Sequence, residues 1–173
     1  MALKPSKNNQ TKSVKPRKAA PTEISILVPV MNEAGNIRPL IDEICAAFAG
    51  RRLEIIYIDD ASNDATPAEL RQALAAVPQL RVLRHASRAG QSVAIRSGLH
   101  MANGELIGVL DGDGQNVPAD FPALEAAVVK AAKKGDMVMA AGIRQRRNDS
   151  ALRLLASRGA RWIRATMLSD THP

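Results

Sequence analysis

The chain has 173 residues, 46% of them hydrophobic, which is enough to bury the core of one domain. Only 2% of the residues are aromatic, which excludes the stacking platforms that bind single-stranded nucleic acids. The formal net charge is +7, but six of the positive charges lie in residues 1–22, which contain no acidic residue, so the remainder is close to neutral.

Residues 1–22 are predicted to form a disordered basic tail, because they combine these charges with Pro, Asn, Ser and Gln and offer little to bury. The tail lacks the apolar stretch of a signal peptide, and no later run is long enough to cross a bilayer. Nonspecific, salt-sensitive binding of nucleic acid by the tail stays open, whereas a specific nucleic-acid partner is not expected. The single cysteine, Cys45, indicates a packed thiol in a reducing compartment.

From residue 23 onwards, apolar segments with strand and helix patterns alternate along the chain. Strands are predicted at 24–30, 53–58, 80–84, 106–110 and 137–141. Helices are predicted at 36–49, 67–76, 90–102 and 118–134, the last of them closed by Gly135. This alternation predicts one α/β domain over residues 23–173, with a mostly parallel sheet and right-handed crossovers.

Acidic and polar side chains follow three of the predicted strands. They are Asn32 and Glu33 after the first strand, Asp59, Asp60 and Asp64 after the second, and Asp111 and Asp113 after the fourth. The carboxyl ends of parallel strands meet at one sheet edge, where open α/β sheets bind ligands, so these side chains are expected to converge. Clustered carboxylates repel one another unless a cation lies among them or a nucleotide separates them. Any one of these residues could instead be a helix N-cap, and Asp64 or Asn63 suits the N-cap of the helix predicted at 67–76.

The most informative stretch is Asp111-Gly-Asp-Gly-Gln115, which follows an apolar strand. Two carboxylates one residue apart, with an amide oxygen two positions later, suit Mg²⁺ or Mn²⁺ carrying a phosphate. A solvated Asp-Gly turn has the same pattern. No Walker A loop is present, nor a Gly-x-Gly-x-x-Gly between the first strand and helix, so a bound nucleotide would rely on carboxylates and a metal.

The histidines are scattered, and no Ser-His-Asp or Cys-His arrangement appears. We expect His85, His100 and His172 to be surface or structural residues rather than catalytic ones.

The last segment is rich in arginine, with seven between residues 144 and 164. A helix from about residue 150 would place Arg153, Ser157, Arg161 and Arg164 on one face. The pattern fits a surface helix with solvated arginines, and it equally fits a site for a phosphate, a pyrophosphate or a membrane surface.

Four motifs occur together in this order: 28–33 (VPVMNE), 59–66 (DDASNDAT), 88–91 (RAGQ) with Gly98, and 111–118 (DGDGQNVP). With them the chain resembles the family 2 inverting glycosyltransferases over residues 23–170. More narrowly it resembles the dolichyl-phosphate mannosyltransferase or polyprenyl-phosphate sugar transferase branch. The resemblance implies a nucleotide-sugar-binding, Rossmann-like sheet of glycosyltransferase A type with flanking helices. It also implies metal-dependent transfer of a sugar, with inversion, from a nucleotide-diphosphate sugar to a dolichyl-type polyprenyl phosphate.

The resemblance also assigns roles to residues. The nucleotide-sugar positions are Pro29, Met31, Glu33, Asp60 and Asp111, and many family members have Tyr where Met31 stands. The metal and diphosphate positions are Asp111, Asp113 and Gln115, with Mg²⁺ or Mn²⁺ as the cofactor. Asp113, Arg144, Arg153 and Ser157 are the catalytic positions, and the last three would hold phosphates of the donor and of the lipid acceptor.

The implied nucleophile is a lipid phosphate that is already anionic, so a strong general base is unnecessary. The implied location is cytoplasmic, at the cytoplasmic face of the membrane, with the protein attached peripherally. The family usually continues beyond residue 171, so the domain is expected to be incomplete at its C-terminus. No oligomeric state is predicted.

Three other functions stay open at this point. One is a phospho-acceptor receiver domain, although the Asp pair follows the second strand rather than the first. Another is an inactive nucleotide-sugar-binding fragment. The last is a soluble glycosyltransferase that builds a surface polysaccharide.

Overall fold

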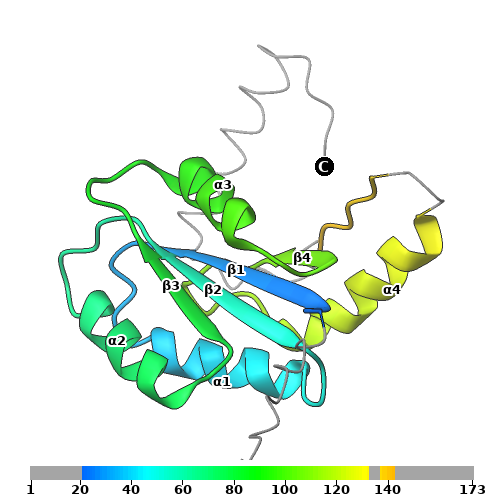
Figure 1. The fold of residues 1–173 in the computed structure, drawn as a ribbon, viewed down its shortest axis with the longest axis horizontal. Coiled ribbons are helices and arrows are strands. Elements are labelled where there is room, and N and C mark those ends of the chain that lie inside the picture. Colours follow the sequence, from blue (N-terminus) through cyan, green and yellow to red (C-terminus); the bar gives the residue numbers. More distant parts are fainter. Residues whose placement is uncertain (1–20, 133–136, 143–173) are drawn as a thin grey trace, which may run out of the picture. The chain divides into compact units, whose positions relative to one another are not determined.

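The computed structural model describes residues 21–132 and 137–142, which include four strands and four α-helices (Figure 1). The strands are β1 (Ile24–Val30), β2 (Leu53–Asp59), β3 (Leu80–Arg84) and β4 (Leu106–Val109). The helices are α1 (Ile37–Ala47), α2 (Thr66–Ala76), α3 (Gln91–Met101) and α4 (Phe121–Ala131), with a 3₁₀ turn, η1 (Pro118–Asp120), before the last. Residues 1–20 of the predicted basic tail, Gly135 and the arginine-rich helix lie outside the described residues.

The four strands form one parallel sheet in the order β3-β2-β1-β4. The chain builds outward from β1 through β2 to β3 and then returns to the other side of β1 to form β4. The strand order therefore reverses between β1 and β4, which is where sheets of this kind open a crevice for ligands. The predicted α/β sheet is confirmed.

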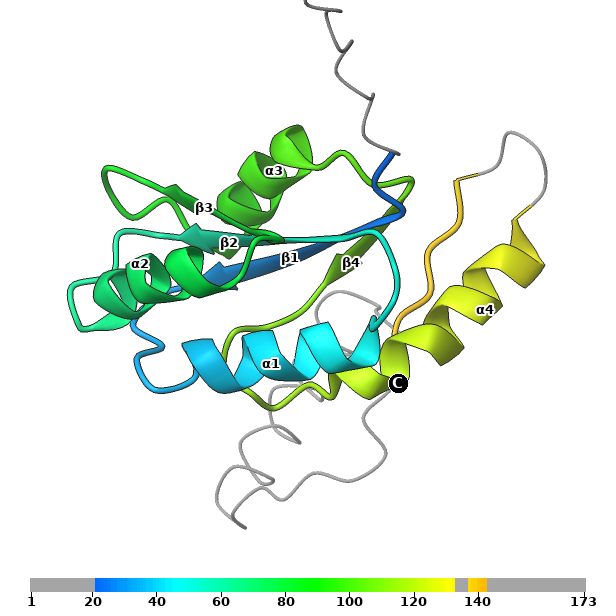
Figure 2. The same cartoon turned by 60° about the horizontal axis from the view of Figure 1, so that its bottom comes forward.

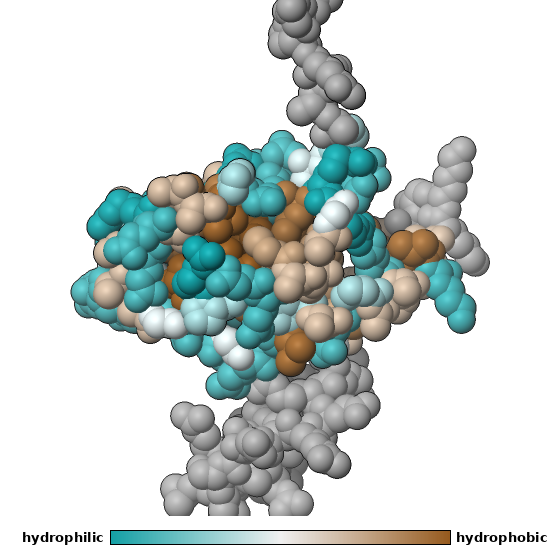
Figure 3. Space-filling view, turned by 90° about the horizontal axis from the view of Figure 1, so that it is seen from below, coloured by the Kyte–Doolittle hydropathy of each residue, from teal (hydrophilic) through white to brown (hydrophobic). Residues whose placement is uncertain are grey.

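Helices cover both faces of the sheet, with α1 and α2 on one side and α3 on the other (Figures 1 and 2). All seven residues of β1 are buried, as expected of a parallel strand that is covered on both faces. Successive residues of β1 pack on opposite faces of the sheet. Ile26 packs in one hydrophobic cluster with Ile41 of α1, and Leu27 packs in the other cluster with Ala94 of α3. On the α1 and α2 side, apolar surface gathers in the middle and polar surface surrounds it (Figure 3).

A buried carboxylate ties the strands together at the amino end of the sheet. Glu54 on β2 accepts hydrogen bonds from the Ser25 hydroxyl on β1, at 2.5 Å, and from both nitrogens of Asn103. It also forms a 3.0 Å ion pair with Arg81 on β3. Because Asn103 lies just after α3, this cluster fixes the connection that leads into β4.

The predicted fifth strand at 137–141 is wrong, since these described residues form no strand. An apolar run becomes a strand only when a neighbouring strand completes its hydrogen bonds, and the local sequence does not specify that neighbour. The chain divides into two compact units, Met1–Ala123 and Leu124–Pro173, and the sheet belongs to the first. None of the helices in the described ranges has the length and apolar composition needed to span a membrane.

Candidate functional site

A cavity of about 370 Å³ opens at the carboxyl ends of β1, β2 and β4, within the first compact unit. Its lining comes from β1 and the turn after it, from the residue after β2, from the start of α3 and the loop before it, and from the turn after β4. The lining residues are Pro29, Val30, Met31, Glu33, Asp60, Arg88, Gly90, Gln91, Ala94, Asp111, Gly112 and Asp113. The cavity thus lies where the strand order reverses, the expected place for a ligand.

The structure brings most of the predicted site residues together, since Pro29, Met31, Glu33, Asp60, Asp111 and Asp113 all line the cavity. Gln115 does not line it, and its backbone N–H donates to Asp113 Oδ1 at 3.0 Å. Arg144, Arg153 and Ser157 lie outside the described residues.

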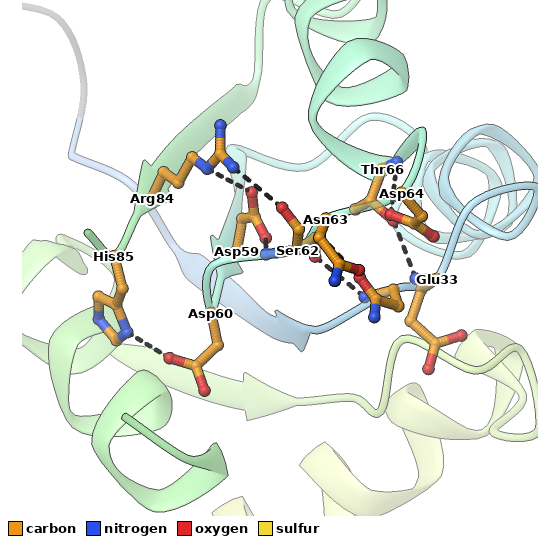
Figure 4. A network of polar contacts seen from close by, with 10 residues as sticks. Glu33, Asp59, Asp60, Ser62, Asn63, Asp64, Thr66, Arg84 and His85 are labelled. Atoms are coloured by element: carbon orange, nitrogen blue, oxygen red, sulfur yellow. Dashed lines mark hydrogen bonds and ion pairs between the residues drawn. The ribbon is translucent and has the colours of Figure 1, made fainter. Parts of the chain in front are cut away.

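Asp59 and Asp64 do not line the cavity, so the expectation that all the acidic residues converge is wrong for these two. Asp59 is buried, accepts the N–H of Ser62 at 2.8 Å and pairs with Arg84 at 3.1 Å (Figure 4). Asp64 accepts the backbone N–H of Thr66 at 2.9 Å. The N-cap of α2 is Ala65, and no side chain forms a cap hydrogen bond, so the predicted N-cap role of Asp64 or Asn63 is wrong. Both carboxylates stabilise the loop between β2 and α2.

The β2–α2 loop and the first residue of α2 fix the backbone of the segment that follows β1. Asn32 adopts a φ of 58°, and its backbone N–H donates to the hydroxyl of Ser62 at 2.9 Å. The next residue, Glu33, donates its N–H to the hydroxyl of Thr66 at 2.9 Å. With its backbone fixed in this way, Glu33 turns its carboxylate to the same side as that of Asp60, away from Asp59 and the β2–α2 loop (Figure 4).

Asp60 is held by three donors from the segment that follows β3. Its Oδ1 accepts the N–H of Ala89 at 2.8 Å and lies 2.7 Å from Nδ1 of His85, and its Oδ2 accepts the N–H of Gly90 at 2.7 Å. Desolvation raises the pKa of Asp60, but the hydrogen bonds from His85, Ala89 and Gly90 outweigh it and leave this pKa below its ordinary value. Asp60 is therefore ionised at neutral pH.

The sequence predicts that His85 is a surface or structural residue; the structure places its mostly buried ring beside Asp60, a partner that could not be predicted. The ring lies between Asp60, at the end of β2, and the hydroxyl of Ser97 on α3, 3.0 Å from its Nε2. The only available signal was the position of His85 directly after β3, and this does not indicate a contact with a residue 25 positions earlier.

The turn after β4 carries the remaining carboxylates. Asp111 accepts hydrogen bonds from the side-chain amides of Gln91, at 2.9 Å, and Asn116, at 3.3 Å. Between the two carboxylates, Gly112 lies against β1, and a Cβ built there would be 2.4 Å from Cγ1 of Val30. Only a residue without a side chain lets the turn approach β1 this closely, which explains the first glycine of the motif.

The charges of the lining indicate what the cavity can bind. It contains four carboxylates, Glu33, Asp60, Asp111 and Asp113, and one guanidinium, that of Arg88. The described part of the chain contains no group of three or more His, Cys, Asp or Glu residues arranged to hold a metal ion by themselves. Two carboxylates do suit Mg²⁺, which is commonly bound by one or two protein carboxylates together with the phosphates of a substrate. The donor set therefore fits a metal that arrives with a phosphorylated ligand.

Comparison with known proteins identifies a family and relatives that match most of the chain. The family model for Glycosyl transferase family 2 matches residues 25–168. The chain is 33% identical over 130 residues to the dodecaprenyl-phosphate galacturonate synthase of Rhizobium johnstonii, covering 73% of this chain and 37% of that protein. It is 37% identical over 139 residues to the undecaprenyl-phosphate 4-deoxy-4-formamido-L-arabinose transferase of Edwardsiella ictaluri, covering 78% and 41%. The chain thus spans about two fifths of the length of these relatives.

Solved structures show the same sheet. The mannosyltransferase PcManGT from Pyrobaculum calidifontis, in complex with GDP-Man and Mn²⁺, has a TM-score of 0.52 and 29% identity, covering 63% of this chain and 34% of that one. S. aureus TarS 1-349 with UDP-GlcNAc has a TM-score of 0.53 and 21% identity, covering 63% and 31%, and shares the fold. The predicted sheet of glycosyltransferase A type is confirmed. The chain belongs to glycosyl transferase family 2.

Proposed function

We propose that the protein transfers a sugar from a nucleotide-diphosphate sugar to a polyprenyl phosphate, with inversion at the anomeric carbon. The names of two relatives, one at 33% and one at 37% identity, support this acceptor, since both act on polyprenyl phosphates. The observation that carries the proposal is the cavity at the strand-order reversal, whose lining joins four carboxylates to a single arginine.

The donor would lie along this cavity. On the nucleoside side we place Pro29, Met31, Glu33 and Asp60, which come from the ends of β1 and β2. Arg88 reaches the same cavity, and the described residues provide it with no ion-pair partner, so its guanidinium is available to a phosphate. The amino end of α3 also borders the cavity through Gly90 and Gln91, and its dipole favours an anion there.

The carboxylates of Asp111 and Asp113 would hold Mg²⁺ or Mn²⁺ next to the diphosphate. The presence of Mn²⁺ with GDP-Man in the mannosyltransferase from P. calidifontis supports a divalent ion in this position. Such an ion would stabilise the negative charge that develops on the leaving diphosphate. We propose that Gln115 contributes through its backbone N–H, which orients Asp113, rather than through a place in the cavity lining.

For the acceptor side we propose Arg144, Arg153 and Ser157, whose side chains would bind the lipid phosphate. A phosphate oxygen is already an anionic nucleophile, so the described residues need supply no general base. Because a polyprenyl chain is held in a bilayer, the reaction would take place at the membrane surface, which we place at its cytoplasmic face.

The proposal is tested by measuring sugar transfer from UDP- and GDP-sugars to undecaprenyl phosphate in the presence of Mn²⁺. We expect Asp113→Asn to lower turnover by at least about a hundredfold, because the substitution removes a negatively charged ligand of the metal ion that would offset the charge of the leaving diphosphate. Asp120→Asn is the matched control, since Asp120 lies in η1 outside the cavity lining. Equal turnover of the wild-type protein and Asp113→Asn would refute the role of this carboxylate.

A further inference from the structure

A continuous series of hydrogen bonds joins the two ends of the cavity. At one end, Asp60 accepts the N–H groups of Ala89 and Gly90. The next residue, Gln91, begins α3 and donates its side-chain amide to Asp111 at the other end. The loop formed by residues 88–91 is thus fixed by one carboxylate and itself contacts the other.

His85 holds the first carboxylate from behind. It is not among the cavity-lining residues, and its side chain is only 14% exposed. Because a carboxylate ion only accepts hydrogen bonds, Nδ1 must carry a proton and donate it to Asp60. The opposite nitrogen, Nε2, lies 3.0 Å from the hydroxyl of Ser97, which can either donate to it or accept from it. The ring is therefore fixed at both nitrogens.

The orientation of Asp60 determines where the loop lies. Its carboxylate is 6% exposed and accepts three donors, two of which are backbone N–H groups of the loop. Gly90 takes a φ of 90°, which L residues with side chains rarely adopt, and it directs its N–H to Oδ2 of Asp60. If the carboxylate rotates, both backbone N–H groups lose their acceptor. Arg88 and Gln91, on either side of them, then lose their fixed positions.

We propose that His85 is a positioning residue of this cavity: it orients Asp60, Asp60 fixes the 88–91 loop, and the loop places Arg88 and the Gln91–Asp111 contact. A side chain behind one end of the cavity thereby controls the geometry at the other end. The identity of the ligand in this inference rests on the proposed function, whereas the loop geometry does not.

The first test needs no ligand. Amide hydrogen exchange of Ala89 and Gly90 is measured by NMR in the full chain. We expect His85→Ala to speed exchange at both amides by at least about tenfold, the effect of losing a hydrogen bond to a charged group. His85→Asn should restore most of the protection, because the Asn amide nitrogen can take the place of Nδ1. His100→Asn, at an exposed position of α3, should leave exchange unchanged.

The second test asks whether the effect reaches the far end of the cavity. Binding of UDP and GDP is measured by calorimetry with Mn²⁺ present. His85→Ala should weaken binding by at least about tenfold and His85→Asn by less, while His100→Asn should bind as the wild type does. If His85 had only a general structural role, His85→Ala and His85→Asn would lose similar amounts of nucleotide affinity. Tighter nucleotide binding by His85→Asn than by His85→Ala is therefore the distinguishing result.

The outcomes separate the two proposals. If the wild-type protein binds neither nucleotide, the proposed function fails, and the amide exchange of Ala89 and Gly90 still decides the role of His85. Unchanged exchange in His85→Ala overturns the inference, and so does unchanged nucleotide binding in that variant. If His85→Ala does not fold, Ser97→Ala replaces it, because this variant removes only the second contact of the ring. Its exchange at Ala89 and Gly90 should rise by a smaller factor, and no rise would overturn the inference.

Discussion

The side-chain nitrogen of Gln91 lies 2.9 Å from Oδ1 of Asp111, so the first residue of α3 is hydrogen-bonded to a carboxylate that follows β4. Gln91→Glu keeps the shape of this side chain but brings two carboxylates together. We expect the variant to melt at a lower temperature, because neighbouring like charges repel. We also expect Mn²⁺ to raise its melting temperature more than that of the wild type. Thermal unfolding with Mn²⁺ and with EDTA measures both effects.

The control for this prediction is Gln72→Glu, which adds the same charge at an exposed position of α2. Equal Mn²⁺-induced shifts in Gln91→Glu and the wild-type protein would contradict a cation site at Asp111.

Gly112 allows the turn after β4 to pass against β1. In Gly112→Ala the new Cβ would stand 2.4 Å from Cγ1 of Val30 and 3.3 Å from the carbonyl oxygen of Pro29. Relief of this clash requires the turn to move, and overpacking of this kind costs about 1–3 kcal/mol. Denaturant unfolding should show the loss, and nucleotide binding should weaken because Asp111 and Asp113 move with the turn. Wild-type stability in Gly112→Ala would contradict the close approach.

Glu54 makes stability depend on pH. Desolvation raises the pKa of Glu54, but hydrogen bonds from Ser25 and Asn103 and the contact with Arg81 outweigh it and leave this pKa below the ordinary 4.5. The resulting stabilisation is fully present above about pH 4.5 and is lost as the pH falls through the lowered pKa. At neutral pH, Glu54→Gln should lower the free energy of unfolding by about 2 kcal/mol. The NH₂ group of the new amide would face the donor groups of Asn103 and Arg81, which now have a carboxylate oxygen as acceptor.

The matched control for Glu54 is Glu43→Gln, at an exposed position of α1. The difference in unfolding free energy between the wild type and Glu54→Gln should shrink as the pH is lowered through this range. A difference that does not change with pH would show that the charge of Glu54 contributes nothing.

Tyr57 carries a polar group in the core. Its side chain is 0% exposed, and its hydroxyl has no hydrogen-bond partner among residues 21–132 and 137–142. Burial raises the pKa of this hydroxyl, which therefore stays neutral. Tyr57→Phe removes an unpaired polar atom, and we expect the free energy of unfolding to rise by about 1 kcal/mol. A loss of stability in denaturant unfolding would show that the hydroxyl has a partner.

Much of the fold follows from local patterns. The apolar runs of β1 and β2 and the helical spacing in α1 place elements within a few residues of their observed bounds. Parallel topology then explains why residues after three different strands line one cavity, so Glu33, Asp60, Asp111 and Asp113 could be grouped before any coordinates were known.

The remainder depends on contacts between distant residues. Asp59 and Asp60 are neighbours with the same side chain, yet one pairs with Arg84 and the other lines the cavity. Alternation along the strand turns the two side chains to opposite sides, and donors some 25–30 residues later decide what each carboxylate binds. The apolar run at 137–141 failed as a strand for a similar reason, since a strand needs a partner that its own sequence does not name.

The central claim is that Asp111 and Asp113 bind a nucleoside diphosphate through a divalent metal. Calorimetric titration of UDP and GDP into the full chain, with Mn²⁺ and then with EDTA, tests it most directly. We expect binding of at least one nucleotide with Mn²⁺, a loss of at least about tenfold in EDTA, and a similar loss in Asp113→Asn with Mn²⁺ present. Binding that is equally tight in EDTA and in Asp113→Asn would contradict the claim.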